Sequence, residues 1–324
     1  MPRFDVITLG SATQDVYLRS SAFRVVRDRR SPTGASEEFA FGSKVELDEV
    51  LTEVGGGATN TAVTFRRQGL RTACVCRVGM DAAGDEVVRI LRAYRVDPRF
   101  VMRDHVHPTA FSALFLSKNG ERSALVARGA SAHFTEQTIP WKKLKARWYY
   151  VCSLGGNIRF LRRILQHAAT SKAQVALNPG KDELRQPATL ALLRKADVLL
   201  LNREEAELLF HTHGPRLWTR VASWRKGTVV ITDGAKGSYA FNATGSWRVH
   251  IKPVKAVDTT GAGDAFGSGF VASLIKHPGN IQEALRLGSM NSAGEVQQLG
   301  AKHGLVTQHA PKTLLMKVMK LRLP

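Results

Sequence analysis

The stretch Val257-Asp258-Thr259-Thr260-Gly261-Ala262-Gly263-Asp264-Ala265-Phe266 decides the fold prediction for this chain. Apolar side chains recur at helical spacing behind it, so it predicts a helix over residues 262–276. That helix contains glycines at 263, 267 and 269. Each would weaken an exposed helix by about 1 kcal/mol relative to alanine. Their presence therefore predicts that a neighbouring element or a ligand packs close to the helix.

The first turn of this predicted helix has the composition of an anion site. The two threonines that precede it, Thr259 and Thr260, are expected to cap the helix. Gly261, Ala262 and Gly263 leave its first backbone N–H groups uncovered, with the positive end of the helix dipole behind them. Such a helix start is suited to a phosphate group.

Asp264 stands one residue inside that site. A carboxylate is repelled by a neighbouring phosphate unless it accepts a proton or holds a metal ion. The position therefore indicates a chemical role for Asp264. A first-turn acid that merely stabilises the helix dipole is the plainer alternative, and the spacing alone leaves it open.

Three commoner phosphate-binding patterns are excluded. The glycine spacing here, Gly-x-Gly-x-x-x-Gly, is one residue too long for the dinucleotide fingerprint, and no acidic residue follows about twenty positions later. The chain contains no Gly-x-x-x-x-Gly-Lys-Ser/Thr loop. It also contains neither His-Arg-Asp nor Asp-Phe-Gly, which excludes a protein kinase fold.

The run Asp-Thr-Thr-Gly-Ala-Gly-Asp-Ala-Phe resembles the second signature of the ribokinase family, the phosphofructokinase-B type of sugar and nucleoside kinases. The resemblance implies that Asp264 is the catalytic base. It also implies that the backbone of Gly261–Gly263 (with Ala262 between them) forms the anion hole for the transferred phosphoryl group. Asp258 and Thr260 occupy positions that often help to bind a monovalent cation, so K⁺ is a further candidate ligand.

Length and composition are consistent with one cytoplasmic domain. The 324 residues, 44% of them hydrophobic, suffice for a single large α/β domain over residues 1–324. No apolar run reaches the roughly eighteen residues of a membrane span, and the N-terminus lacks the apolar core of a signal peptide. Cys74 and Cys76 face the same side of a predicted strand without a second pair that would complete a zinc site. We expect them to be reduced and at least half-buried.

The chain is strongly basic, with 47 Lys and Arg against 27 Asp and Glu, a net charge of +20. Such a balance is typical of nucleic-acid-binding proteins. The basic residues are dispersed along the chain, however, and no aromatic-interleaved binding motif accompanies them. We therefore expect a generally basic surface, which attracts anionic nucleotides, and no dedicated nucleic-acid site.

The N-terminal region carries predicted substrate residues. Asp15 comes shortly after the strand predicted at residues 4–10, where open α/β sheets place ligands, although a turn role is an equal alternative. Gly55-Gly56-Gly57-Ala58-Thr59-Asn60 resembles the first signature of the family. The resemblance implies that Asp15, Gly56, Gly57 and Asn60 contact the hydroxyl groups of the substrate.

A small sheet is expected beside the main one. Residues 39–41 and 44–47 suggest short strands, and two apolar runs at 109–116 and 123–126 flank Asn119-Gly120, a hairpin signal. Family members insert a β-sheet lid here, so the resemblance implies a lid from about 16–53 and 107–128. Dimers that form through this lid occur in the family, and a homodimer is a candidate assembly.

Strands and helices alternate through the rest of the chain. Strands are predicted near 72–78, 148–154, 174–177, 198–201 and 228–232, separated by helices. This alternation favours a mostly parallel sheet covered on both faces. The expected fold is therefore a three-layer α/β/α sandwich of the ribokinase-like type with a small β-sheet lid.

The resemblance also implies a nucleotide site for ATP. Asn202-Arg203-Glu204-Glu205 matches the family's Asn-x-x-Glu motif, in which Glu205 organises Mg²⁺ through water. Helix capping is a plausible alternative role for Asn202. The residues expected to contact the nucleotide are Asn202, Thr232, Gly234, Gly237 and Asn291.

The predicted reaction is transfer of the ATP γ-phosphoryl group to a hydroxyl of a sugar that is ribose-, fructose- or 2-keto-3-deoxygluconate-like. Arg128-Gly-Ala-Ser-Ala resembles the 2-keto-3-deoxygluconate kinases, where arginine meets a substrate carboxylate. A surface arginine on the lid is the alternative. Nucleoside kinases of the family remain a second interpretation. A basic nucleic-acid-binding protein that uses the kinase fold as a scaffold is a third.

Overall fold

The computed structural model describes residues 3–31, 34–116, 122–224, 226–251, 253–308 and 318–321. A ten-stranded sheet runs through these residues in the order β16-β15-β14-β13-β12-β11-β10-β1-β6-β7. The seven strands from β13 to β7 are parallel, and β14, β15 and β16 add antiparallel strands at one edge. The strands are β1 (Phe4–Leu9), β6 (Thr72–Gly79), β7 (Asp97–Asp104), β10 (Ala146–Val151), β11 (Gln174–Leu177), β12 (Val198–Asn202), β13 (Thr228–Thr232), β14 (Ser238–Asn242), β15 (Gly245–Val249) and β16 (Val318–Lys320).

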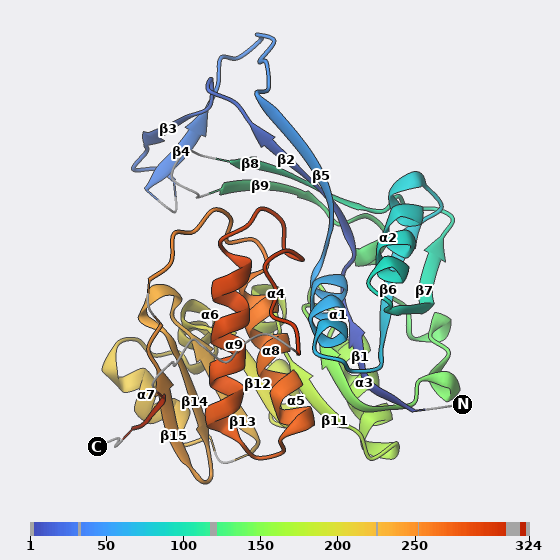
Figure 1. Cartoon of the computed structure of the whole chain (residues 1–324), viewed down its shortest axis with the longest axis vertical. Coiled ribbons are helices and arrows are strands. Elements are labelled where there is room, and N and C mark those ends of the chain that lie inside the picture. The colour runs from blue at the N-terminus through green and yellow to red at the C-terminus, as the bar shows by residue number, and fades with distance from the viewer. Residues whose placement is uncertain are drawn as a thin grey trace.

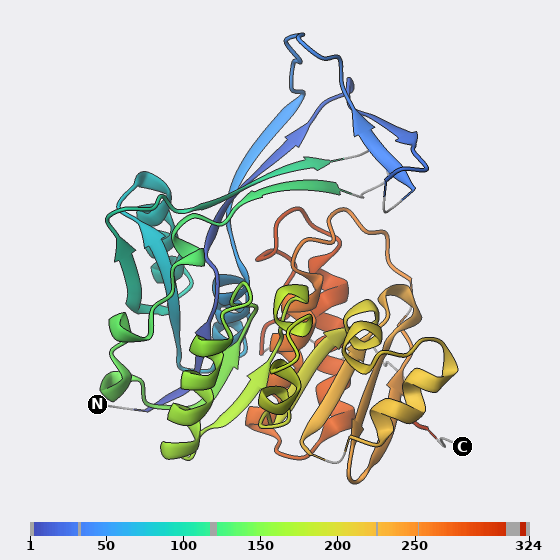
Figure 2. The ribbon, with the colours of Figure 1, turned by 180° about the vertical axis from the view of Figure 1, so that it is seen from behind.

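Helices cover both faces of this sheet. One face packs on α1 (Gly57–Arg67), α2 (Ala82–Ala93), α8 (Ala262–Lys276) and α9 (Ile281–Glu295), which lie toward the viewer in Figure 1. The other face, turned forward in Figure 2, packs on α3 (Ile158–Thr170), α4 (Lys181–Leu184), α5 (Thr189–Leu193), α6 (Arg203–Phe210) and α7 (Pro215–Ala222). The central strands are apolar on both faces because each face is buried under helices. The predicted three-layer α/β/α fold is confirmed.

A separate four-stranded sheet, in the order β5-β2-β8-β9, stands beside the main one. It combines β2 (Thr13–Arg19), β5 (Glu49–Gly55), β8 (Ala110–Leu116) and β9 (Arg122–Ala127), and β3 (Arg24–Arg27) pairs with β4 (Ala35–Glu38) beyond it. Figures 1 and 2 show this small sheet extending over the end of the molecule at which α8 begins. The predicted small sheet is therefore present.

Two details of that prediction need correction. Residues 39–41 and 44–47 are not strands. The ring of Phe39 instead stacks on Phe115, with 6.3 Å between the centroids, and Phe41 is fully exposed, so these apolar residues do not follow the alternation of a pleated strand. The predicted Asn119-Gly120 turn lies outside the described residues, although β8 and β9 on either side of it pair antiparallel.

The structure also shows the state of the cysteines and the length of the helices. Cys74, Cys76 and Cys152 are free thiols buried in the core. None of the helices among the described residues is both long and apolar enough to cross a membrane.

Candidate active site

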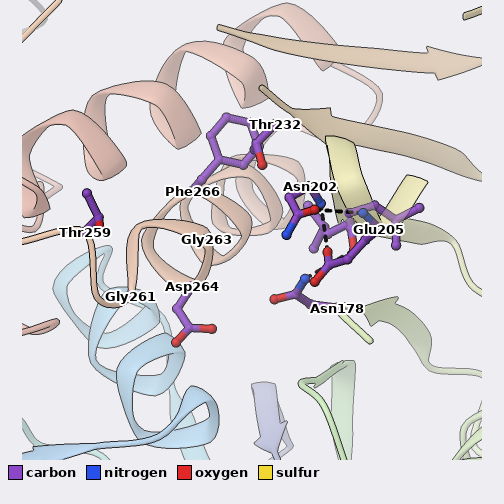
Figure 3. A pocket seen from close by; sticks show the side chains of 11 residues that line it. Asn178, Asn202, Glu205, Thr232, Thr259, Gly261, Gly263, Asp264 and Phe266 are labelled. Carbon is purple, nitrogen blue, oxygen red and sulfur yellow. Dashed lines mark hydrogen bonds between the residues drawn. The ribbon is translucent and has the colours of Figure 1, made fainter. Parts of the chain in front are cut away.

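A cavity of about 270 Å³ opens where the parallel strands of the main sheet end and α8 begins. Figure 3 shows that its polar lining comes from two sides: the start of α8 on one side, and Asn178 after β11, Asn202 at the end of β12 and Glu205 on α6 on the other. Ligands of open α/β sheets bind at this edge because the strands present their carboxyl ends and the following helices their N-termini there. The polar residues that line the cavity are Asn178, Asn202, Glu205, Thr232, Thr259 and Asp264, together with Gly261 and Gly263.

The first turn of α8 lacks a side-chain cap. Its N-cap residue is Gly261, with φ of 94°, and no side chain bonds to the first N–H groups. The prediction that Thr259 and Thr260 cap the helix is therefore wrong. The hydroxyl of Thr260 instead donates to Asp258 Oδ1 at 2.5 Å. The N–H groups of Gly261–Gly263 are left without a capping side chain, as an anion site requires.

The three glycines of α8 have different neighbours. A β-carbon on Gly267 would overlap the hydroxyl of Tyr150, and one on Gly269 would lie 3.1 Å from Asn291 Cβ on α9. A β-carbon on Gly263 would meet no atom within 4 Å. Two glycines therefore allow close packing of neighbouring elements, and Gly263 faces open space at the cavity. The explanation that a neighbouring element packs close is confirmed for Gly267 and Gly269, and the explanation that a ligand does so stays a prediction for Gly263.

Asp264 lies on the first turn of α8 and faces α1. Its Oδ2 accepts a hydrogen bond from Asn60 Nδ2 at 3.0 Å. Burial raises the pKa of Asp264, while the bond from Asn60 and the nearby ammonium of Lys302 favour the ionised form. The carboxylate is thus fixed by one oxygen and placed at the edge of the cavity, which is the arrangement that a base for a hydroxyl proton needs.

Asn202 and Glu205 form the opposite side of the cavity. Asn202 Oδ1 accepts from Glu205 N and Glu205 Oε2 accepts from Asn202 N, both at 2.8 Å, so the pair is a capping box at the start of α6. The capping alternative for Asn202 therefore holds, and the residue lines the cavity as well. Burial raises the pKa of Glu205, so a bound cation would relieve an unfavourable buried charge.

The first signature brings Asn60 beside Asp264. Gly56 has φ of 92°, and a β-carbon there would lie 2.5 Å from the carbonyl of Ser11, so the turn into α1 requires glycine. A β-carbon on Gly57 would lie 3.4 Å from Asp264 Oδ1 and closer still to Cys152. Gly56 therefore allows the start of α1 to approach the turn at Ser11, and Gly57 allows it to approach Cys152 after β10.

Asp15 lies on β2, within the small sheet, and not in the turn after β1. Its side chain is 6% exposed and accepts a hydrogen bond from Thr13 Oγ1 at 2.8 Å. A β-carbon on Gly55 would overlap its carboxylate. The negative charge of Asp15 helps to raise the pKa of Asp264, so the two carboxylates lie near enough to repel each other.

Other predicted residues lie away from the cavity lining. Asn291 is fully buried: its Nδ2 donates to Ala265 O at 2.7 Å and its Oδ1 accepts from Val306 N at 2.8 Å, so it joins α9 to α8 and is not exposed to make the predicted nucleotide contact. A β-carbon on Gly237 would overlap the carbonyl of Val249, so this glycine serves the approach of β15. Gly234, with φ of 51°, has open space around it.

Arg128 is exposed and pairs with Asp182 across 3.0 Å. Thr232 lines the cavity from the end of β13.

Sequence reasoning missed two polar residues at the site. Asn178 lines the cavity directly after β11 and donates to Leu200 O at 3.2 Å. The rule that selected Asn202, a polar residue at the carboxyl end of a buried strand, selects Asn178 equally well. Lys302 Nζ donates to Asn60 Oδ1 at 2.6 Å, and its local sequence carries no comparable signal.

Residues 27–308 match the sequence profile of the pfkB family carbohydrate kinases. Ribokinase of Haemophilus influenzae is 27% identical to this chain, over 78% of this chain and 84% of the ribokinase. The probable fructokinase-6 of Arabidopsis thaliana is 28% identical, over 82% of this chain and 75% of the fructokinase. Among solved structures, Arabidopsis thaliana ribokinase complexed with ribose and ATP superposes with a TM-score of 0.77 at 22% identity, covering 95% of this chain and 97% of its own. Burkholderia thailandensis nucleoside kinase in complex with inosine gives 0.74 at 18%, covering 94% and 95%. These two structures share the fold. The chain belongs to the pfkB family of carbohydrate kinases, ATP-utilising phosphotransferases with an alcohol group as acceptor.

Proposed function

We propose that this protein transfers the γ-phosphoryl group of ATP to a hydroxyl of a small sugar that is ribose-, fructose- or 2-keto-3-deoxygluconate-like. The observation that carries the proposal is the placement of the Asp264 carboxylate, held by Asn60, at the uncapped start of α8. A base and an anion site thus share one turn of helix. The ribokinase and fructokinase relatives support a sugar as the acceptor.

The roles of this chain's residues follow from that placement. Asp264 accepts the proton of the acceptor hydroxyl, and the loose transition state of phosphoryl transfer places little demand on its basicity. Backbone N–H groups of Gly261–Gly263 stabilise the charge on the transferred group. Asp15, Gly56, Gly57 and Asn60 orient the acceptor.

The cavity is suited to the phosphates of a nucleotide. Its floor at Gly263 is open and its helix start is uncapped, so no side chain of the described residues occupies the anion position. Asn202, Thr232, Gly234 and Gly237 are the proposed nucleotide contacts, to which Asn178 is added from the cavity lining.

A magnesium ion fits the oxygen-rich side of the cavity. Glu205 would hold the ion through water, because Mg²⁺ prefers oxygen ligands and retains several waters. When bound, Mg²⁺ neutralises charge on the phosphates. A monovalent cation such as K⁺ would lie near Asp258 and Thr260, beside the anion site. The carboxylate of Asp258 already accepts from Gly300 N at 3.1 Å, which fixes its orientation there.

The remaining predictions extend the same proposal. The small sheet formed by residues near 16–53 and 107–128 would close over the acceptor within a single domain, and a homodimer would form through it. The protein would act in the cytoplasm. The alternative is a basic nucleic-acid-binding protein that uses the kinase fold as a scaffold. Retention of the protein on duplex DNA, with an affinity that falls steeply as the salt concentration rises, would favour this alternative.

A nucleoside is the second candidate acceptor. The fold is shared with the nucleoside kinase in complex with inosine, and Asp15 and Asn60 would serve the ribose hydroxyls of a nucleoside as well as those of a free sugar. An acceptor panel therefore has to include both classes.

The proposal is tested by ATP consumption with Mg²⁺ and K⁺ against ribose, fructose, 2-keto-3-deoxygluconate, adenosine, inosine, cytidine and pseudouridine. Asp264→Asn is the control variant. We expect one acceptor class to be consumed by the wild type and turnover to fall by about 10²- to 10⁴-fold in the variant, with ATP binding retained. Turnover equal to the wild type in Asp264→Asn would overturn the role of Asp264, and silence across the panel would overturn the proposed acceptors.

A further inference from the structure

Lys302 is buried beside the proposed base, although it follows the last helix and belongs to neither signature. Its side chain is 2% exposed. The ammonium donates to Asn60 Oδ1 at 2.6 Å and also to the carbonyl of Val54. A buried lysine is costly unless its charge has partners, so its presence here calls for a reason beyond packing.

The ammonium determines which way the Asn60 amide points. An ammonium only donates hydrogen bonds, so the amide atom that faces it has to be the oxygen. The nitrogen of the same amide then faces Asp264 and donates to Oδ2 at 3.0 Å. With the amide reversed, its nitrogen would meet the ammonium and its oxygen would meet the carboxylate, which are two repulsive contacts.

We propose that Lys302 is a positioning residue, which orients the Asn60 amide and through it fixes Asp264 as an ionised acceptor for the substrate proton. The proposal rests on the proposed kinase function and adds a residue to its site. Lys302 touches neither the proposed phosphate site nor the cavity lining, so it acts through Asn60 and through its charge.

The charges around Lys302 are consistent with this role. Burial lowers the pKa of Lys302 to about 8, so the group is still an ammonium at neutral pH. Acidic residues on three other elements face it and oppose that lowering. The titratable groups that act on it are Asp15 on β2, Glu53 on β5, Asp264 on α8 and the Cys74 thiol on β6. The charge of Lys302 lowers the pKa of Asp264 and the charge of Asp15 raises it. The charge of Asp264 in turn helps to raise the pKa values of Tyr150 and Cys152.

Two variants separate orientation from charge. Lys302→Met removes both the donors and the charge, whereas Lys302→Gln removes the charge but keeps an amide N–H group that can donate to Asn60. Lys276→Met is the matched control, because Lys276 lies at the far end of α8, its ammonium also donates to a side-chain amide oxygen, that of Gln68 at 3.4 Å, and burial also lowers its pKa. Thermal unfolding of all three reports whether each variant folds.

The kinetic measurement is the pH profile of kcat with the acceptor found in the panel. We expect Lys302→Met to lower kcat by about 10- to 100-fold and to move the acidic limb up by about one pH unit, since Asp264 loses a stabilising charge. The acidic limb of the Lys302→Gln profile should move by the same amount. At pH values above that limb, Lys302→Gln should retain a higher kcat than Lys302→Met. A wild-type profile in Lys302→Met overturns the proposal. Equal losses in both variants overturn the orienting part.

A second measurement does not depend on activity. Titration of isotope-labelled aspartate carboxyls by NMR, with Asp264 assigned by its absence in Asp264→Asn, reports its pKa directly. We expect the pKa of Asp264 to rise by about one unit in Lys302→Gln and to stay unchanged in Lys276→Met. An unchanged pKa in Lys302→Gln overturns the proposal even if Lys302→Met does not fold. If the wild type consumes no ATP with any acceptor, the kinase function fails, and this titration still decides the role of Lys302.

Discussion

Alanine substitution of two glycines in α8 tests whether the start of this helix is the phosphate site. Gly263 and Gly269 lie on the same helix, six residues apart, and neither has a positive φ. The added methyl group at position 263 meets no atom within 4 Å. At position 269 it meets Asn291 Cβ at 3.1 Å and Gly288 Cα at 3.2 Å, both on α9. The same added methyl group therefore enters open space at position 263 and a close helix contact at position 269.

The expected effects on stability differ in sign. Glycine is less favourable in a helix than alanine by up to about 1 kcal/mol, so Gly263→Ala should stabilise the protein by about 0.5 kcal/mol at this terminal turn. Gly269→Ala gains the same helix propensity but crowds α9, and overpacking costs about 1 to 3 kcal/mol. We expect a net loss of about 1 kcal/mol for Gly269→Ala, a decrease in Tm of about 2 °C.

For activity we expect the opposite order: Gly263→Ala, the more stable variant, should be the less active one. The methyl group of Gly263→Ala takes space at the proposed anion site, and displacement of the transferred group by about 1 Å lowers turnover by about 100-fold. Gly269→Ala should keep most of the activity of the wild type. The assays are thermal unfolding and steady-state ATP consumption at saturating acceptor. Turnover of Gly263→Ala within twofold of the wild type would refute the placement of the phosphoryl group at this turn.

Three further predictions address other parts of the site. Glu205→Gln should leave Tm nearly unchanged, because glutamine preserves the capping box with Asn202. It should raise the Mg²⁺ concentration for half-maximal turnover about tenfold. An unchanged Mg²⁺ titration would contradict the proposed role of Glu205 at the metal. Because burial raises the pKa of Asp264 above its ordinary 3.8 and the base acts when ionised, kcat should fall as the pH decreases through a midpoint above 3.8, and a midpoint below it would contradict this assignment. Arg128→Ala removes an exposed ion pair and should change stability by less than about 1 kcal/mol, whereas KM for a carboxylate-bearing sugar should rise about tenfold; an unaffected KM would exclude Arg128 as a carboxylate ligand.

Local signals in the sequence were sufficient for α8, for the predicted parallel strands of the main sheet and for the two signatures, whereas the strands expected at 39–41 and 44–47 are absent. The span 262–276 was predicted from apolar spacing and is the span of α8 in the structure. Asp264, Gly263, Glu205 and Thr232 were all selected from local motifs, and the structure brings them to one cavity. This works because helix starts and strand ends are fixed by short-range backbone chemistry, and an α/β sheet gathers them at one edge.

Other predictions failed because a motif does not show which partner a polar side chain bonds to in the folded chain. The threonines before α8 were expected to cap it, yet Thr260 bonds to Asp258. Asn291 was expected at the nucleotide, yet its amide is fully used between α8, α9 and the segment at Val306. A hydrogen-bonding side chain has the same appearance in a sequence whether its partner is a ligand or another part of the protein.

The sequence alone determined the α/β layers, the family and the anion-binding helix start with its aspartate. The tertiary structure decided which side chains meet there. Asn60 reaches Asp264 across 204 residues of chain, and Lys302 reaches Asn60 across 242. The reason is physical: periodicity and motifs report on neighbours within a few residues, whereas the charge and orientation of a buried carboxylate depend on groups that only the folded chain brings within hydrogen-bonding distance.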